Sequence, residues 1–272
     1  MGSGLGHALR SGGHPVVTTL QGRSDRTARL AHAAGLTVVS TLTDVVATAA
    51  VVLVVTPPGE ALAAAADIAT ASANTDNRPL VADLNAIAPS TVEEIARVLG
   101  RVGLDLVDGS ISGPPPTVRP GARIYLSGPR ADEVAGLSWP DVEPVVVGPN
   151  VGTASAVKMC TASVYKGMVG LFAQAMRAAE HYGVLETVLA DLATGGHDPT
   201  PAVAVAVTKA ERYVPEMRAI SATQAAAGLP ASLFDAFAEV YGQLAASELA
   251  SADPESVDRR ISAHELLARL AR

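Results

Sequence analysis

The sequence predicts an α/β domain built on a parallel sheet, followed by an all-α domain. From about residue 15 to residue 148, short runs rich in β-branched residues alternate with alanine-rich amphipathic stretches. Alternation of strand and helix at this spacing is typical of a parallel sheet with crossover helices. After residue 148 long helical periods take over, and Gly148, Pro149, Asn150 and Gly152 cluster at the change. We therefore expect domains at residues 1–149 and 150–272.

Individual elements follow from the same patterns. Residues 51–56 and 80–84 are apolar throughout, as expected of strands that helices cover on both faces. Residues 251–255 combine a serine, an aspartate and a proline, in the order expected for the start of a last helix. The predicted strands cover residues 16–20, 36–39, 51–56, 80–84 and 104–107, and the predicted helices cover residues 25–34, 61–71, 90–99, 152–182, 185–194, 202–227, 230–251 and 254–271.

Composition narrows the class of protein. The 272 residues are 49% hydrophobic and carry a formal net charge of −7, which excludes intrinsic disorder. No run of Lys or Arg is present, so we expect no nucleic-acid partner and no membrane-surface partner. We find no secretory signal pattern, and the longest apolar run, residues 45–56, is too short to span a bilayer. A small molecule as ligand and a cytoplasmic location are the expectations.

Metal and disulfide chemistry are not indicated. The six histidines show no metal-ligand spacing, and the single cysteine, Cys160, has no partner with which to form an intrachain disulfide. We expect Cys160 in the core. The acidic pairs Asp132 with Glu133 and Asp253 with Glu255 are expected to be helix-start charges rather than a catalytic pair.

The chain opens with glycines at positions 2, 4 and 6 that run into a short helical stretch. In a dinucleotide-binding unit such glycines stand between the first strand and a helix, where the backbone approaches a pyrophosphate. Here no strand precedes them. A flexible N-terminal tail would account for a glycine pattern without its strand equally well.

The glycine pattern is part of a longer stretch that resembles a known family. Gly2, Gly6, Leu9 and the Gly13-His14 pair resemble the second half of the fingerprint of the β-hydroxyacid dehydrogenases, the group of 3-hydroxyisobutyrate and 6-phosphogluconate dehydrogenases. The resemblance implies a Rossmann-like first domain in which Gly2 is the third fingerprint glycine and binds cofactor, while the first strand and two glycines are missing. A sheet without its central strand leaves backbone groups unpaired. We therefore expect the true start to lie upstream of Met1.

Three further stretches carry the cofactor predictions. Residues 51–58 and 83–90 resemble the family's turns beside the nicotinamide, which implies cofactor contacts from four residues; an ordinary buried strand and a generic helix start are the alternatives. Residues 18–24 contain no acid at the strand end, and Arg23 and Ser24 suit a ribose 2′-phosphate, so NADP is expected rather than NAD although Asp25 follows. The four residues beside the nicotinamide are Thr56, Pro57, Pro58 and Asn85.

Residues 108–113 look like the family's substrate-binding Asp-x-Pro-Val-Ser-Gly-Gly motif. The resemblance implies that Ser112 and Gly113 hold the substrate carboxylate, for which a hydroxyl and an amide are suitable donors. Two positions depart from the motif, because Ser110 replaces the proline and Pro114 replaces the second glycine. A plain loop leaving a strand at residue 107 is the alternative.

Lys158 is the candidate general acid/base. Oxidation of a hydroxyl requires a base, and a lysine on an apolar helix face loses part of its preference for the charged form. A solvated charge on an alanine-rich helix is the alternative, but residues 148–158 resemble the family's glycine-rich turn and catalytic lysine. The family's asparagine four residues later is Ala162 here, so we expect Thr161 and Lys166 on the next turn to contact substrate.

Residues 158–167 and 212–217 are similar to a poorly characterised branch of 6-phosphogluconate dehydrogenase-like proteins. The resemblance as a whole implies an NADP-dependent oxidoreductase that transfers a hydride between the nicotinamide and a small β-hydroxy acid. It also implies a homodimer formed through the helical domain. Two alternatives stay open: an imine reductase, and a non-catalytic dimeric protein with an impaired dinucleotide site.

Overall fold

A computed structural model describes residues 1–252 and 256–271. The chain divides into two compact units, Met1–Met159 and Cys160–Arg272. The first unit is α/β and the second is helical, which confirms the predicted fold class. The division falls within one long helix, α7 (Thr153–His181), so the boundary expected after residue 149 stays a prediction.

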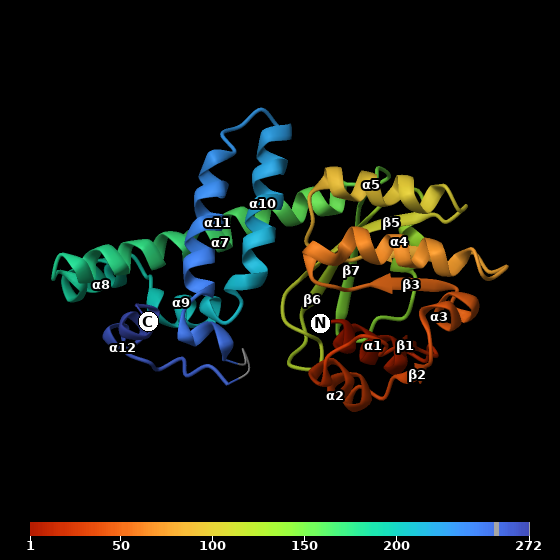
Figure 1. Ribbon diagram of the computed structural model, residues 1–272, viewed down its shortest axis with the longest axis horizontal. Coiled ribbons are helices and arrows are strands. Elements are labelled where there is room, and N and C mark those ends of the chain that lie inside the picture. The colour runs from red at the N-terminus through yellow and green to blue at the C-terminus, as the bar shows by residue number, and fades with distance from the viewer. Residues whose placement is uncertain (253–255, 272) are drawn as a thin grey trace. The chain divides into compact units, whose positions relative to one another are not determined.

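The first unit contains two separate sheets (Figure 1). The larger has the order β3-β4-β5-β6-β7, in which β3, β4 and β5 are parallel, β6 runs antiparallel to β5, and β7 is parallel to β6. The smaller is a parallel pair of β1 and β2. The strands are β1 (Val17–Thr19), β2 (Thr37–Val39), β3 (Val51–Val54), β4 (Leu80–Asp83), β5 (Leu106–Ser112), β6 (Ala122–Ser127) and β7 (Val142–Gly148).

An open position separates the two sheets. Within the described residues, neither β1 nor β3 pairs with a strand on its second side. In a doubly wound sheet the strand that precedes the glycine turn lies between these two strands. The chain instead begins with helix α1 (Gly2–Ser11), so residues 2–11 are helical and the flexible-tail alternative is wrong.

Helices cover both faces of the larger sheet, and the alternation of side chains along β4 divides the core into two clusters. Leu80 and Ala82 pack with α1 in one cluster, while Val81 packs with α4 and α5 in the other. This explains why β4 is apolar up to Asp83, its last residue. The helices of this unit are α1, α2 (Asp25–Ala33), α3 (Leu42–Thr48), α4 (Ala61–Ser72), α5 (Pro89–Gly100), α6 (Ala131–Ala135) and the first turns of α7, with a 3₁₀ turn at Pro58–Glu60.

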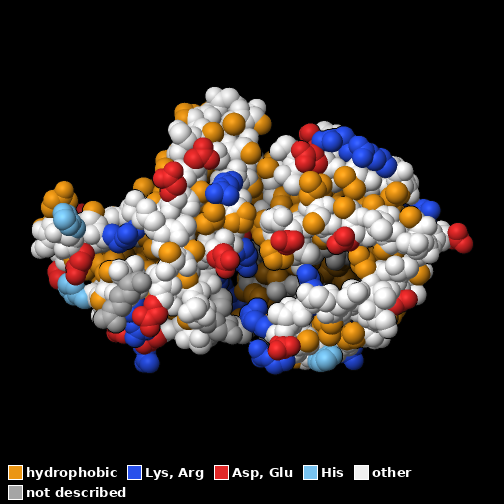
Figure 2. Space-filling view, viewed as in Figure 1, with side chains coloured by type: hydrophobic (Ala, Val, Ile, Leu, Met, Phe, Trp, Pro, Cys, Tyr) orange, Lys and Arg blue, Asp and Glu red, His pale blue; other side chains and the backbone are white. Residues whose placement is uncertain are grey.

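The outer surface of this layer is also partly apolar. Figure 2 shows hydrophobic side chains spread over α4, where Leu62, Ala63 and Ala66 are exposed. Basic side chains gather over α5, which carries Arg97 in its last turn. A cation at that end suits the negative end of the helix dipole.

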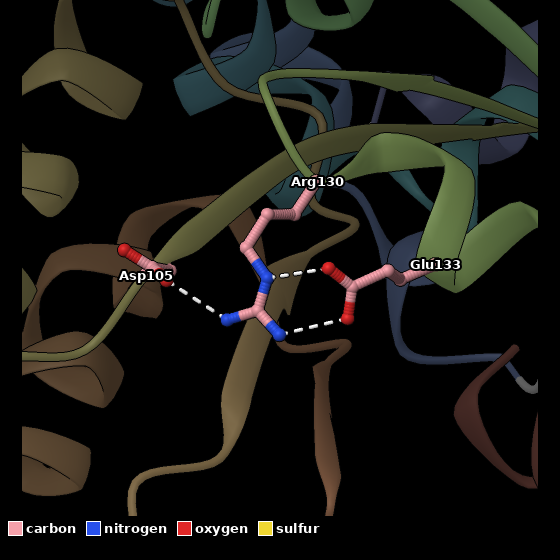
Figure 3. A network of polar contacts seen from close by, with 3 residues as sticks. All are labelled: Asp105, Arg130 and Glu133. Atoms are coloured by element: carbon pink, nitrogen blue, oxygen red, sulfur yellow. Dashed lines mark hydrogen bonds and ion pairs between the residues drawn. The ribbon is translucent and has the colours of Figure 1, made fainter.

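An ion-pair network fixes the amino end of β5. Arg130 pairs with Glu133 at 2.6 Å and with Asp105, directly before β5, at 2.8 Å (Figure 3). Asp132 and Glu133 lie in the first turn of α6, as predicted for helix-start charges. These side chains are 40–65% exposed, so the network contributes little to stability.

The helical unit holds α8 to α12 and most of α7. The antiparallel pair α10 and α11 packs closely, with Met217, Ile220, Tyr241 and Leu244 almost fully buried between helices. The bounds are α8 (Leu185–Thr194), α9 (Pro199–Val207), α10 (Ala210–Ala226), α11 (Ser232–Ala245), a 3₁₀ turn at Glu248–Ser251 and α12 (Ala263–Leu270). In the part of the chain that is described, no helix is both long and apolar enough to cross a membrane.

Several predicted elements are wrong in detail. The strand predicted at 104–107 is β5, which extends to Ser112, while β6 and β7 were not predicted. The helix predicted at 202–227 is two helices, α9 and α10, and at their junction the Lys209 amide donates to the Ala206 carbonyl, three residues back, at 3.0 Å. Residues 256–262 are not helical, because Ser262 caps α12 by accepting from the Glu265 amide. The predicted cap and first turn at residues 253–255, with Asp253 and Glu255, lie outside the described residues.

Cys160 is exposed, so its predicted core position is wrong. Its neighbour Met159 is fully buried on α7, and a rotation of about 100° per residue turns Cys160 away from that core.

Candidate functional site

The carboxyl ends of β3 and β4 carry two predicted cofactor residues in direct contact. Thr56 follows β3 and Asn85 follows β4, and the parallel pairing of Val54 with Asp83 brings these ends together. The Thr56 amide donates to Asn85 Oδ1 at 2.7 Å, and Asn85 Nδ2 donates to Thr56 Oγ1 at 3.2 Å. The structure thus locks the two turns to each other. Pro57 and Pro58 continue the first turn into a 3₁₀ turn, with Pro58 at its start.

The amino end of α1 lies beside the same edge of the sheet. A Cβ at Gly2 would stand 3.4 Å from Val55 Cβ, one residue before Thr56. The amides of Gly2 and Ser3 precede the first helical hydrogen bond, which runs from the Gly4 amide to the Met1 carbonyl at 2.9 Å. Such amides at a helix start suit the pyrophosphate of a dinucleotide. Gly2, Ser3, Thr56 and Asn85 therefore fit a nicotinamide dinucleotide at the carboxyl end of the sheet.

The other two glycines of the opening have packing roles. A Cβ at Gly6 would lie 2.9 Å from Leu36 Cδ2, and one at Gly4 would lie 3.0 Å from Pro116 Cδ. Close approach of α1 to its neighbours therefore requires small residues at both positions.

The residues predicted to select NADP lie on the smaller sheet. Arg23 and Ser24 are exposed in the turn between β1 and α2. Ser24 caps α2, because its hydroxyl accepts from the Thr27 amide at 3.3 Å. Among the described residues, no hydrogen bond connects either one to Thr56 or Asn85. Arg23 and Ser24 therefore have no direct hydrogen bond to the two residues that follow β3 and β4.

Asp83, at the end of β4, supports the turn that contains Asn85. Its carboxylate accepts from the Asn85 amide at 2.9 Å and from Asn85 Nδ2 at 3.0 Å, and the residue is only 2% exposed. Burial raises the pKa of Asp83 to about 7, with a smaller contribution from the charge of Asp108, against the opposing effect of the Asn85 hydrogen bonds. Asp83 therefore changes protonation near neutral pH.

Asp108 connects β5 to the start of α7. Its Oδ2 accepts from Ser127 Oγ and the Gly152 amide, both at 2.9 Å, and from the Ser155 amide at 3.0 Å; its Oδ1 accepts from Ser155 Oγ at 2.6 Å. A carboxylate at this position satisfies helix-start amides and favours the positive end of the helix dipole. Asp108 thus fixes the first turn of the helix that carries Lys158.

Lys158 reaches the predicted substrate motif. Its Nζ donates to the Ile111 carbonyl at 2.7 Å, directly before Ser112 and Gly113. Gly113 has φ of +95°, and a Cβ there would stand 2.9 Å from the Gly121 carbonyl oxygen, so the position requires glycine. The structure therefore brings together the predicted base and the predicted carboxylate-binding residues.

The departures from the motif have structural explanations. Ser110 is fully buried and its hydroxyl donates to the Ala154 carbonyl at 3.0 Å, so it binds α7 rather than facing a ligand. The motif also lies inside β5 as far as Ser112, not in a loop leaving the strand.

The two remaining predicted residues belong to the helical unit. Thr161 is exposed, and Ala162 is 4% exposed. The Lys166 ammonium contacts the carboxylate of the buried Glu216 and lies 4.3 Å from the centre of the Tyr213 ring. The substrate contacts of Thr161 and Lys166 stay predictions.

Sequence reasoning assigned no role to Asp83, Asp108 or Ser155. The available signal was a carboxylate within a run of buried apolar residues, at the end of β4 and again inside β5. Burial of an acid in such a strand requires hydrogen-bond partners. The partners of Asp108 come from β6 and from the turn and first residues of α7, 19 to 47 residues away in sequence, and no local pattern identifies them.

Comparisons with known proteins agree with this arrangement. Residues 1–138 match the family described as the NAD binding domain of 6-phosphogluconate dehydrogenase, and residues 179–244 match a domain of unknown function, DUF1932. A search of curated proteins gave no match.

Solved structures of similar fold cover nearly the whole chain. A conserved protein of unknown function, described as structurally similar to 3-hydroxyacid dehydrogenases, is 30% identical with a TM-score of 0.65, over 89% of this chain and 92% of that chain. The 3-hydroxyisobutyrate dehydrogenase of Mycobacterium tuberculosis is 22% identical with a TM-score of 0.69, over 94% of each chain. A reductive aminase from Aspergillus terreus is 16% identical with a TM-score of 0.54, over 94% of this chain and 93% of that chain.

The fold and the family match define a protein with a nicotinamide-dinucleotide-binding domain of the oxidoreductase type. The chain belongs to the 6-phosphogluconate dehydrogenase-like family. This family is part of a wider β-hydroxyacid dehydrogenase-like group.

Proposed function

We propose that this protein is an NADP-dependent oxidoreductase that transfers a hydride between the nicotinamide and the carbinol carbon of a small β-hydroxy acid. One observation carries the proposal: Lys158 Nζ lies 2.7 Å from the carbonyl oxygen of Ile111, immediately before Ser112 and Gly113. An amine next to donors that suit a carboxylate can act on the hydroxyl of the same small molecule.

Each residue has a distinct part in the reaction. The Ser112 hydroxyl and the Gly113 amide hold the carboxylate and so fix the carbinol carbon. In oxidation the neutral Lys158 amine accepts the hydroxyl proton, and in reduction the ammonium returns it. The nicotinamide, when bound, supplies the hydride acceptor or donor. Asp108 acts through α7 by holding the turn that precedes Lys158.

The cofactor would be held at three points. The amides of Gly2 and Ser3 suit the pyrophosphate, and Thr56, Pro57, Pro58 and Asn85 lie where the nicotinamide half would bind. The exposed Arg23, with Ser24, supplies a donor for the 2′-phosphate, which favours NADP over NAD.

The test separates chemistry from binding. Turnover of a panel of short β-hydroxy acids with NADP is measured for the wild type, Lys158→Ala and Lys158→Arg, together with NADPH affinity by calorimetry. Both variants should lose about 10²-fold or more in turnover, because arginine keeps the charge but cannot accept a proton. Affinity for NADPH should change little. Near-normal turnover of the Ala variant would overturn the lysine mechanism.

Imine reduction is the second candidate. The specific observation is Ala162, which places a buried methyl group where the hydroxyacid dehydrogenases carry an asparagine amide. A solved reductive aminase and solved imine reductases share this fold. The test is consumption of NADPH with a cyclic imine and with the keto acids that are the oxidised forms of the β-hydroxy acids. Activity with the imine and none with the keto acids would favour this candidate over the first.

We further propose that the helical unit forms a homodimer through α7. Val164, Met168 and Leu171 are 63%, 38% and 58% exposed and recur at the spacing of one helix face, next to the exposed Tyr165. A continuous apolar stripe of this kind marks an interaction surface. The resemblance to dimeric dehydrogenases favours a second copy of this chain as the occupant.

A further inference from the structure

The helical unit contains a hollow of about 420 Å³, lined by side chains of α7, α9, α10 and α11 and by Arg259. Its volume lies in the range of small-molecule sites. Of the lining residues, only Lys166 enters the substrate predictions made from the sequence. Every residue discussed below belongs to Cys160–Arg272, so the inference does not depend on the proposed function.

Positive charge exceeds negative charge around the hollow. Lys166 and Arg212 share one buried carboxylate, Glu216, with Arg212 Nε 3.5 Å from Glu216 Oε1. Lys209 is near Arg212 and Arg259, and burial together with these two charges lowers the pKa of Lys209. Among the described residues that line the hollow, Lys166 and Arg259 are cationic and none is acidic, a distribution that favours an anionic ligand.

Asp258, next to Arg259 in sequence, contacts Arg260. Its Oδ1 accepts from the Arg260 amide at 2.9 Å and lies 3.9 Å from Arg260 Nε. Arg259 thus lines the hollow while its neighbour Arg260 pairs with the acid.

An aromatic wall stands beside the cations. The rings of Tyr213 and Tyr241 meet edge to face with centres 5.2 Å apart, and Tyr241 Oη donates to the Lys166 carbonyl at 2.7 Å. Burial raises the pKa of Tyr213, so its hydroxyl stays neutral and does not repel an anion. A rigid pair of rings offers an apolar surface at low entropic cost.

We propose that this hollow binds a small organic anion, in which a phosphate or carboxylate group faces Arg259 and Lys166 and an apolar or aromatic body packs against Tyr213 and Tyr241. Neither half of the hollow suffices alone, because the cations attract any anion and the rings select those with an apolar body.

Calorimetry with simple probes tests the proposal. Phenyl phosphate and benzoate carry the two acidic groups on one ring, and inorganic phosphate lacks the ring. The wild type should bind at least one aromatic probe at least about tenfold more tightly than inorganic phosphate. Tighter binding of phenyl phosphate would indicate a phosphate ligand, and tighter binding of benzoate would indicate a carboxylate ligand. Equal affinity for inorganic phosphate, or no binding of either aromatic probe at millimolar concentration, would overturn the proposal.

Two exposed arginines provide a matched pair of variants. Arg259→Gln should weaken binding of the better probe about tenfold. The side chain of Arg260 is 96% exposed, and Arg260→Gln should leave the affinity for that probe within about twofold of the wild type. Both substitutions are on the surface, and circular dichroism checks that each variant folds. An equal effect of the two substitutions would show general attraction by surface charge and overturn the site.

Discussion

Ser155 of α7 donates twice to Asp108 of β5, through its amide at 3.0 Å and its hydroxyl at 2.6 Å. This pair fixes the first turn of α7 to the sheet, one turn before Lys158. The position of the candidate base is therefore set by a fully buried carboxylate on the sheet.

Asp108→Asn should destabilise the protein by about 2–4 kcal/mol, because a neutral amide cannot accept all four hydrogen bonds and one buried donor loses its partner. Ser127→Ala removes one of these four bonds and also the hydroxyl that accepts from the Ala154 amide at 2.9 Å, and it should cost less, about 1–2 kcal/mol. Urea unfolding measures both. If the two variants were equally stable, Asp108 would not be the centre of this network.

Stability should fall as pH rises from about 4 to about 7. The pKa of Asp83 is about 7 in the folded protein and about 4 when unfolded, so in this window the folded state binds more protons and a higher pH favours unfolding. The effect is at most about 4 kcal/mol. Asp83→Asn should flatten the profile, whereas Asp105→Asn, on a 65% exposed side chain, should leave it unchanged. Unfolding in urea from pH 4 to pH 8 gives the profile, and an unchanged slope in the Asp83 variant would contradict the prediction.

Arg23→Gln should weaken NADPH binding about tenfold and leave NADH binding unchanged, because only NADPH carries the 2′-phosphate. Arg29→Gln, an exposed arginine on α2, serves as the control. Calorimetry with both cofactors separates the cases. A parallel loss of NADH affinity would assign Arg23 a role other than phosphate recognition.

Leu171→Glu should convert a dimer into a monomer, because it places a charge on the exposed apolar stripe of α7. Val118→Glu, at a 71% exposed position in the first unit, should leave the dimer intact. Sedimentation velocity distinguishes these states. A monomeric wild type at micromolar concentration would refute the proposed interface.

Sequence patterns predicted most of the larger sheet, because β3 and β4 are apolar runs with a clear length, and they placed Thr56 and Asn85 at adjacent strand ends. They failed for β6 and β7, where β6 returns antiparallel and β7 carries Pro144, so neither resembles the preceding units. The break between α9 and α10 has no local marker, because Thr208 bonds the Val205 carbonyl much as Thr223 bonds the Ala219 carbonyl inside the unbroken α10. The links from Asp108 to α7 are tertiary contacts between distant segments, and only the fold reveals them.

The anchoring of α7 also limits how this protein can be divided or recombined. A cut at the glycine-rich turn near residue 149 would leave Lys158 on the helical fragment and Asp108 on the other, so α7 would lose the carboxylate that satisfies its first amides. The helical part is therefore not an exchangeable module when it is cut at this turn. A chimera with a relative should retain the candidate base in position only if β5 and the start of α7 come from the same parent.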